Sequence, residues 1–322
     1  MLAVHLESGR VTLRRQPLPR VPEGFARIRL LAAGICSTDL ELQRGYYGFS
    51  GTPGHEFVGE VVSVSETNGD ESKWIGQRVV GEINLACGKC DWCKRGLGRH
   101  CPTRTVLGIV RHPGAFREFL TLPIRNLHRV PASIPTEHAV FLEPVAAACE
   151  ILDQVEIPKG SPVAVLGDGK LGLLVSQVLQ AHGARVHLYG RHREKMRLVE
   201  PTGVTTEIVP KKLPVSAWPF VVDATGSSQG LQSAISMCVP RGTVIMKSTV
   251  HGLVSIDTAP AIVHEITLVG SRCGRFEAAL PLLAIGKVRV ASMISGEFPL
   301  DQAPKAFAQA AKKGVLKVLL RP

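Results

Sequence analysis

The chain has 322 residues, enough for two domains, and its 45% hydrophobic content and 32 glycines are typical of a soluble, loop-rich α/β protein. Its net charge is +11, but Lys and Arg are spread along the chain and only 5% of residues are aromatic, which argues against a nucleic-acid partner. No stretch approaches the length of a transmembrane helix, and the first residues indicate a β-strand rather than a signal peptide. We therefore expect a cytoplasmic protein with no membrane partner.

The first part of the chain, to about residue 130, is predicted to be β-rich because short apolar segments alternate with glycine and proline turns. Strands are expected at 26–31, 57–64 and 78–83, and the first of these shows the period-two alternation of a half-buried strand.

Possible metal ligands stand among these strands. Cys36 follows Gly34-Ile35, the pair His55-Glu56 follows Pro53-Gly54, and Glu143 comes before Pro144 at the end of the β-rich part. Cys, His and Glu all bind zinc, and three protein ligands with one open position make a catalytic site. Each residue alone would be unremarkable, since a lone His is more often structural.

Four cysteines fall within the fifteen residues 87–101, with the spacing C-x2-C-x2-C-x7-C: Cys87, Cys90, Cys93 and Cys101. Short loops of this kind can wrap one tetrahedral zinc ion, and four thiolates leave no open position, so the site would be structural. Disulfides are the alternative, but a chain without a secretory signal favours reduced cysteines.

The pattern changes near residue 135. A helical segment spans about 135–155, and short buried strands then alternate with helices: strands at 162–166, 185–189, 220–224, 242–246 and 266–270, with a helix at 170–182. Such alternation predicts a parallel sheet. A final helix at 300–312 and a strand at 315–320 are expected to return to the first domain.

A G-x-G-x-x-G turn follows the first of these strands and opens the helix; it comprises Gly167, Asp168, Gly169, Lys170, Leu171 and Gly172. In this context the motif predicts dinucleotide binding, with the pyrophosphate at the helix N-terminus. An ordinary turn between strand and helix is the alternative.

The end of the second strand, Gly190-Arg191-His192-Arg193, carries no carboxylate for a ribose 2′-hydroxyl. Gly190 leaves room, and Arg191, with Arg193 nearby, can bind a 2′-phosphate, so NADP is predicted in preference to NAD. A solvated helix start is the alternative for the two arginines. Further cofactor contacts are expected from Thr225, Gly226 and Ser248, which follow later strand ends, and Arg272 and Lys317 are weaker candidates for the pyrophosphate.

Taken in order, these segments resemble the zinc-dependent medium-chain dehydrogenase family, which includes alcohol, sorbitol and threonine dehydrogenases. The matching segments are 34–39, 54–60, 87–101, 143–144, 167–172 and 222–226. The resemblance implies a GroES-like catalytic domain at 1–145 with the cysteine segment as a structural zinc lobe. It also implies a doubly wound Rossmann domain at 146–280 and a return of the chain to the first domain at 281–322. In this family the active site lies between the two domains, and the protein is expected to form a homodimer or homotetramer.

The resemblance also implies roles. Cys36 and His55 would hold a catalytic zinc, Glu143 or Glu56 would complete it, and Thr38 would accept the substrate proton, giving two zinc ions per chain. The reaction would be hydride transfer between an alcohol (a secondary alcohol, polyol or amino alcohol) and NADP or NAD. A zinc-free NADPH-dependent reductase and a non-catalytic dinucleotide-binding protein are the alternatives.

Two segments depart from the family pattern. Many members carry a histidine three residues after the proton-relay hydroxyl, and this chain has Glu41 there. The segment 200–220 is short and contains four prolines, where a Rossmann domain would usually place more helix. We expect a trimmed region at that edge of the sheet.

Overall fold

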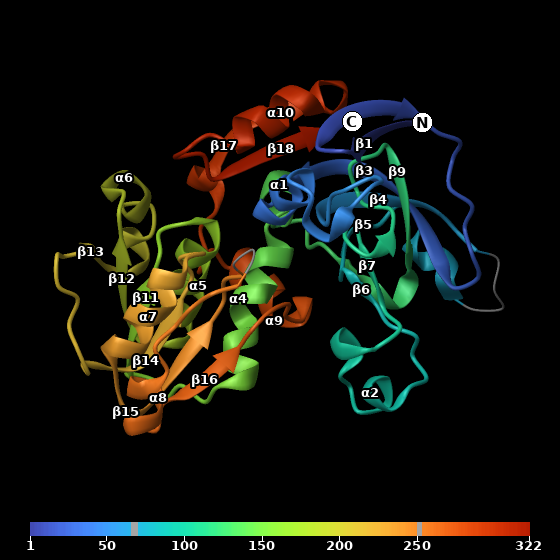
Figure 1. The fold of residues 1–322 in the computed structure, drawn as a ribbon. Helices are drawn as coiled ribbons and strands as arrows, with labels where there is room; N and C mark the ends of the chain where they lie inside the picture. The colour runs from blue at the N-terminus through green and yellow to red at the C-terminus, as the bar shows by residue number, and fades with distance from the viewer. Residues whose placement is uncertain (66–69, 250–252) are drawn as a thin grey trace. The chain divides into compact units, whose positions relative to one another are not determined.

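The computed structural model describes residues 1–65, 70–249 and 253–322 (Figure 1). Contacts divide the chain into two compact units, one formed by Met1–Glu143 with Ile294–Pro322 and the other by Pro144–Met293. The first is β-rich and the second alternates strands with helices, as the sequence pattern predicts.

The first unit is built around β3 (Phe25–Gly34), which pairs antiparallel with β4 (Glu56–Val64), β9 (Phe119–Pro123) and β18 (Lys317–Arg321). These strands belong to a seven-stranded sheet in which six strands have the order β10-β5-β4-β3-β18-β17 and the seventh, β9, pairs with β3 outside this order. β1-β2 and β6-β7-β8 form two smaller sheets. The remaining strands are β1 (Leu2–Glu7), β2 (Arg10–Arg15), β5 (Arg78–Gly81), β6 (Asn84–Leu85), β7 (Thr105–Leu107), β8 (Arg111–His112), β10 (Leu127–Arg129) and β17 (Ile294–Pro299).

The last segment of the chain completes this unit, because β18 joins the sheet and α10 (Ala303–Ala310) packs on β18 and β17. The buried face of α10 includes Phe307, whose ring meets that of Phe116 edge-on with centroids 5.9 Å apart. The other short helices of the unit are α1 (Ser37–Gln43), α2 (Asp91–Lys94), α3 (Thr136–Ala139), η1 (Tyr46–Gly48), η2 (Asp70–Trp74), η3 (Gly98–His100), η4 (Ile124–Asn126) and η7 (Leu300–Gln302).

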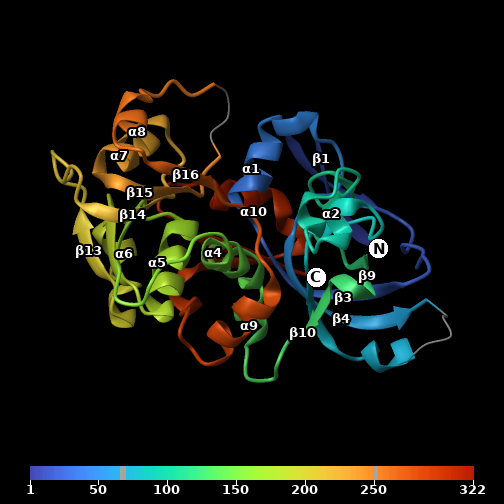
Figure 2. The ribbon, with the colours of Figure 1, turned by 90° about the horizontal axis from the view of Figure 1, so that it is seen from below.

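The second unit holds one six-stranded parallel sheet with the order β13-β12-β11-β14-β15-β16. Its strands are β11 (Pro162–Leu166), β12 (Arg185–Gly190), β13 (Thr205–Ile208), β14 (Trp218–Asp223), β15 (Cys238–Met246) and β16 (Thr267–Gly270). Helix α5 (Lys170–His182) packs on β11 and β12, and α7 (Ser228–Met237) packs on β14 and β15, on the opposite face (Figure 2). This doubly wound arrangement confirms the predicted Rossmann domain, with its order reversal beside β11.

The other helices that lie wholly or mainly in the second unit are α4 (Leu142–Gln154), α6 (Arg193–Met196), α8 (Ala259–Val263), α9 (Phe276–Ala284), η5 (Glu200–Thr202) and η6 (Ala291–Met293). The segment beside the sheet edge at β13 contains less helix than a Rossmann domain usually has there, as expected. Residues 209–217 connect β13 to β14 as a loop, and Val209 and Leu213 pack on the buried cluster that includes Tyr189. Apolar loop side chains thus cover part of the core where the sequence is too rich in proline for a helix.

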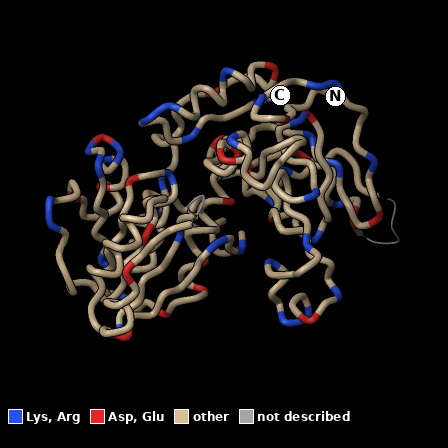
Figure 3. The backbone as a smooth tube through the Cα atoms, viewed as in Figure 1, with Lys and Arg blue, Asp and Glu red and all other residues tan. Residues whose placement is uncertain are grey.

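In the part of the chain that the structure describes, every helix is too short or too polar to cross a lipid bilayer. Lys and Arg are scattered over both units rather than gathered in one patch (Figure 3).

Candidate metal centres and dinucleotide turn

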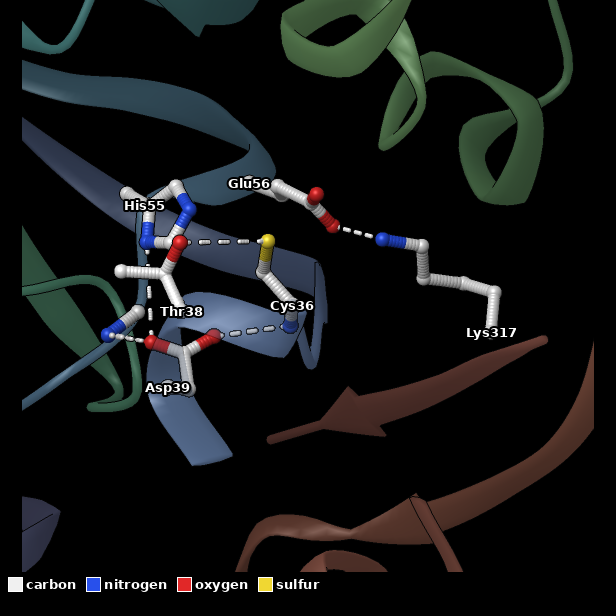
Figure 4. A network of polar contacts seen from close by, with 7 residues as sticks. Cys36, Thr38, Asp39, His55, Glu56 and Lys317 are labelled. Atoms are coloured by element: carbon white, nitrogen blue, oxygen red, sulfur yellow. Dashed lines mark hydrogen bonds and ion pairs between the residues drawn. The ribbon is translucent and has the colours of Figure 1, made fainter. Parts of the chain in front are cut away.

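Cys36, His55 and Glu56 lie together in the first unit (Figure 4). Strand β3 ends at Gly34 and β4 begins at Glu56, and these two residues are paired across the antiparallel ladder. The register therefore brings Cys36, at the start of α1, beside His55 and Glu56. One ligand atom from each residue lies within 4.8 Å of the other two, a spacing that suits a shared metal ion.

Asp39 supports this group from beneath. Its carboxylate is fully buried and accepts hydrogen bonds from the backbone N–H of Cys36 at 2.8 Å and of Gly54 at 3.2 Å. Its Oδ1 also lies 3.5 Å from His55 Nδ1, which leaves Nε2 as the ring nitrogen for a metal. Burial alone would lower the pKa of His55, but the Asp39 carboxylate, assisted by the Cys36 thiol, raises that pKa well above its ordinary value.

Glu56 is paired with a buried lysine. Lys317 donates a hydrogen bond to Glu56 Oε2, both side chains are almost fully buried, and the ammonium lies 5.5 Å from the centre of the Phe141 ring. Burial lowers the pKa of Lys317, but the Glu56 carboxylate more than compensates and raises it. The expectation that Lys317 reaches the cofactor pyrophosphate is therefore wrong, because β18 buries this side chain beside Glu56.

The two residues of the expected proton path, Thr38 and Glu41, have different surroundings. The Thr38 hydroxyl lies 3.8 Å from Cys36 Sγ, whereas Glu41 accepts a hydrogen bond from Arg44 at 2.5 Å in an exposed pair on α1. Glu143 lies in the first turn of α4, and among the described residues it is not part of the group that Cys36 forms. Its role as a ligand stays a prediction.

The cysteine segment forms a second group. Sγ of Cys90 lies 3.5 Å from that of Cys93 and 3.8 Å from that of Cys101, and Cys87 and Cys93 are 3.9 Å apart. A tetrahedral ion with bonds of about 2.3 Å separates its sulfur ligands by about 3.8 Å, whereas a disulfide needs about 2.05 Å. All of the chain's cysteines are free, so the donor set fits zinc rather than disulfides.

The thiols of the lobe differ in how readily they lose their protons. The backbone N–H of Cys87 points to Cys101 Sγ at 3.5 Å and, with the Thr103 hydroxyl, lowers the pKa of Cys101 to about 6. Desolvation and the neighbouring Cys90 thiol raise the pKa of Cys93 to about 11. Such a divided set is expected where closely spaced thiols titrate together, and binding of a metal ion would release the protons that remain.

Cys101→Ser is expected to remove one zinc ion per chain and to lower the apparent Tm by about 5 °C or more, because a structural site contributes its binding free energy to folding. Metal analysis and thermal unfolding measure both effects. The Cys36 group should keep its own ion in this variant, and loss of both ions or of neither would contradict two separate sites.

The glycine turn has the geometry that a dinucleotide requires. Gly167 has φ +109°, and a Cβ there would lie 2.6 Å from the Ala224 carbonyl oxygen, while a Cβ at Gly172 would meet the Gly167 oxygen at 1.9 Å. Gly169 differs, because a Cβ there would meet no protein atom within 4 Å. The protein's own packing does not demand glycine at 169, which stands beside the N-terminus of α5, where dinucleotide-binding folds place the pyrophosphate.

Other predicted cofactor residues lie at ends of strands in the same sheet. The Asp223 carboxylate accepts hydrogen bonds from the N–H and hydroxyl of Thr225, and the Ser248 hydroxyl accepts one from the N–H of Gly226. Desolvation raises the pKa of Asp223. These bonds fix the loops that follow β14 and β15.

Near the end of β12, Arg193 donates to Thr206 at 2.9 Å and lies 3.1 Å from Glu200. It is therefore engaged with the edge of the sheet, whereas the Arg191 side chain is exposed.

Sequence reasoning did not predict the contacts that Asp39 and Lys317 make with the Cys36, His55 and Glu56 group. Asp39 had a local signal, since an acid three residues after Cys36 at a helix start can accept the Cys36 N–H. Lys317 had none, because it is 261 residues from Glu56 in sequence.

Comparisons with known proteins agree with this geometry. Residues 22–132 match the family model described as the alcohol dehydrogenase GroES-like domain, and residues 171–285 match the model described as zinc-binding dehydrogenase. A sorbitol dehydrogenase from Halalkalibacterium halodurans is 28% identical, covering 98% of this chain and 96% of its own length. A D-altritol 5-dehydrogenase from Agrobacterium fabrum is 29% identical, covering 92% of each chain.

A solved structure described as a zinc-binding dehydrogenase from Sinorhizobium meliloti 1021, bound to NADP, is 28% identical to this chain. It superimposes with a TM-score of 0.88 and covers 100% of this chain and 99% of that one.

Proposed function

Because the chain belongs to the zinc-dependent medium-chain dehydrogenase family and is an NAD(P)-dependent alcohol dehydrogenase-like enzyme, we propose that it oxidises a secondary alcohol or polyol at a zinc centre, with NADP preferred. The observation that carries this proposal is the group formed by Cys36, His55 and Glu56. A zinc-free reductase would have no need of these three ligand atoms within 4.8 Å of one another.

When bound, zinc supplies Lewis acidity toward the substrate oxygen, and the nicotinamide supplies the hydride chemistry. Cys36 and His55 would hold the metal, and Asp39 would fix the tautomer of His55 through Nδ1. The Thr38 hydroxyl, which lies 3.8 Å from Cys36 Sγ, would accept the substrate proton.

The third protein ligand would be Glu56 or Glu143. Glu56 is favoured by its place in the group, although its Oε2 is bonded to Lys317. Zinc content of Glu56→Gln and Glu143→Gln variants separates the two, since loss of the ligand itself should lower metal affinity more than loss of the other glutamate.

The cofactor proposal rests on Arg191, whose exposed side chain offers positive charge to a 2′-phosphate. The expected space at Gly190 is instead filled by Asp168 and Met196. It is supported by the Sinorhizobium meliloti structure, which binds NADP. The polyol proposal rests on relatives named for sorbitol and D-altritol.

Zinc content per chain, measured together with an NADPH-linked screen of ketoses, simple ketones and their alcohols, tests the function. Two ions per chain with turnover is the expected result. A folded protein with only the lobe ion that still reduces carbonyls would favour the zinc-free reductase, and dinucleotide binding without any turnover would favour a non-catalytic protein.

Glu41→Gln is expected to change the pH dependence of kcat more than KM, if Glu41 takes the outer place in the proton path that a histidine holds in many relatives. Glu60→Gln is the control, because Glu60 on β4 is a similar acid whose partner is Arg29 on β3. Matching pH profiles for the wild type and Glu41→Gln would remove Glu41 from that path.

The chain is also proposed to form a homodimer or homotetramer. Strand β16 is an edge of the parallel sheet, and Leu268 on it is partly exposed, so a second copy could extend the sheet there. A monomeric mass in solution would exclude this arrangement.

A further inference from the structure

The loop after β11 brings the Asp168 carboxylate to the end of β12, although the residues at that strand end include no acid. The Asp168 carboxylate is 7% exposed, and its Oδ2 accepts hydrogen bonds from the backbone N–H of Arg191 at 2.7 Å and of His192 at 2.5 Å. His192 Nδ1 also lies 3.0 Å from the same oxygen. All of these bonds end on Oδ2.

The Asp168 carboxylate occupies the space that a side chain at position 190, the last residue of β12, would fill. A Cβ at Gly190 would lie 2.7 Å from Asp168 Cβ and 2.9 Å from its Oδ2. In dinucleotide-binding sheets an acid at the end of the second strand accepts the ribose 2′-hydroxyl of NAD. Here the glycine turn of the first strand supplies a carboxylate to that same place, and Gly190 is the residue that makes room for it.

We propose that Asp168 is a specificity-determining residue of the dinucleotide site, where it accepts the ribose 2′-hydroxyl and opposes a 2′-phosphate. The inference rests on the proposed function only in placing the dinucleotide at the glycine turn. A phosphate there would lie close to a buried carboxylate, and like charges at short range in a partly desolvated site repel strongly. It would also compete with Asp168 for the N–H groups of Arg191 and His192.

Asp168 and Arg191 therefore act in opposite directions on one position of the cofactor. Arg191 attracts a 2′-phosphate and Asp168 disfavours it, so the preference for NADP is limited and NAD remains usable. The sequence alone suggests only the arginine's contribution, because Asp168 lies within the glycine motif, where the intervening residues are normally unconstrained.

Equilibrium binding of NAD⁺ and NADP⁺ to the full zinc-loaded chain tests the inference. Asp168→Asn keeps the size and an acceptor oxygen but removes the charge, and it is expected to change the ratio of the two Kd values at least tenfold in favour of NADP⁺. Glu194→Gln, an exposed acid on α6, is the matched control and should change the ratio less than twofold.

A second variant keeps the test decisive if Asp168→Asn unfolds. Arg191→Ala alters an exposed side chain and leaves Asp168 as the dominant charge. It should bind adenosine 2′,5′-bisphosphate at least tenfold more weakly than 5′-AMP. An unchanged Kd ratio in Asp168→Asn, or equal binding of the two nucleotides by Arg191→Ala, would overturn the role of Asp168. Failure of the wild type to bind either dinucleotide would instead count against the proposed function.

Discussion

Cys36→Ser is expected to lower kcat/KM about 1,000-fold or more and to reduce the zinc content from two ions per chain to one. A thiolate is a strong zinc ligand and a serine hydroxyl is a poor one, so the group would keep only His55 and Glu56. Loss of Lewis-acid stabilisation amounts to several kcal/mol of transition-state free energy, which corresponds to a factor of this size. Metal analysis and steady-state kinetics on the same preparation measure both effects.

Cys149→Ala is the matched control for this experiment. Cys149 is buried in α4 of the second unit, where desolvation raises its pKa to about 12, so it remains a neutral thiol. Its replacement should leave both zinc ions and most of the activity in place. If Cys36→Ser keeps two ions and wild-type turnover, Cys36 is not a ligand and the zinc-dependent mechanism fails.

The sequence predicts best those features that depend on neighbours in the chain. The helix at 170–182 and the glycine turn before it follow from local periodicity and from the contacts that Gly167 and Gly172 make within one strand–turn–helix unit. The four cysteines likewise lie within one short loop. In each case the pattern and the structure it specifies span about twenty residues or fewer.

Features that depend on distant strand pairing escape such reasoning. Cys36 and His55 were recognisable as possible ligands from residue type, but their approach depends on the register of β3 against β4. The contact of Lys317 with Glu56 depends on β18 returning to pair with β3, where Leu319 lies opposite Gly34. Asp168 shows a related limit, because its position in the motif is evident but the direction of its side chain is not.

In metal-free protein, Lys317→Met is expected to lower the free energy of unfolding by about 3–5 kcal/mol, because it leaves the Glu56 carboxylate buried without a counter-charge. Methionine fills a similar volume, so little of the loss should come from a cavity. Glycine at position 34 indicates how tightly the pair is enclosed, since a Cβ there would lie 2.8 Å from Glu56 Oε2 and 3.0 Å from Lys317 Cδ. Urea unfolding at neutral pH measures the loss, and Lys305→Met, which removes an exposed lysine on α10, should cost less than about 0.5 kcal/mol.

The double variant Glu56→Gln/Lys317→Met separates a paired charge from simple packing. Removing both charges eliminates the unpaired ion, so the double variant should lose less stability than the sum of the single variants, by about 2 kcal/mol or more. Additive losses would mean that the two side chains contribute through packing alone.

The pH dependence of this stabilisation has a definite sign. Because the pKa of Lys317 is raised in the folded state, its stabilising charge is fully present at neutral pH and is lost only as pH rises through that raised value. A stability difference between wild type and Lys317→Met that vanished between pH 6 and 8 would therefore contradict the pairing, since neither the folded nor the unfolded lysine loses its proton in that range.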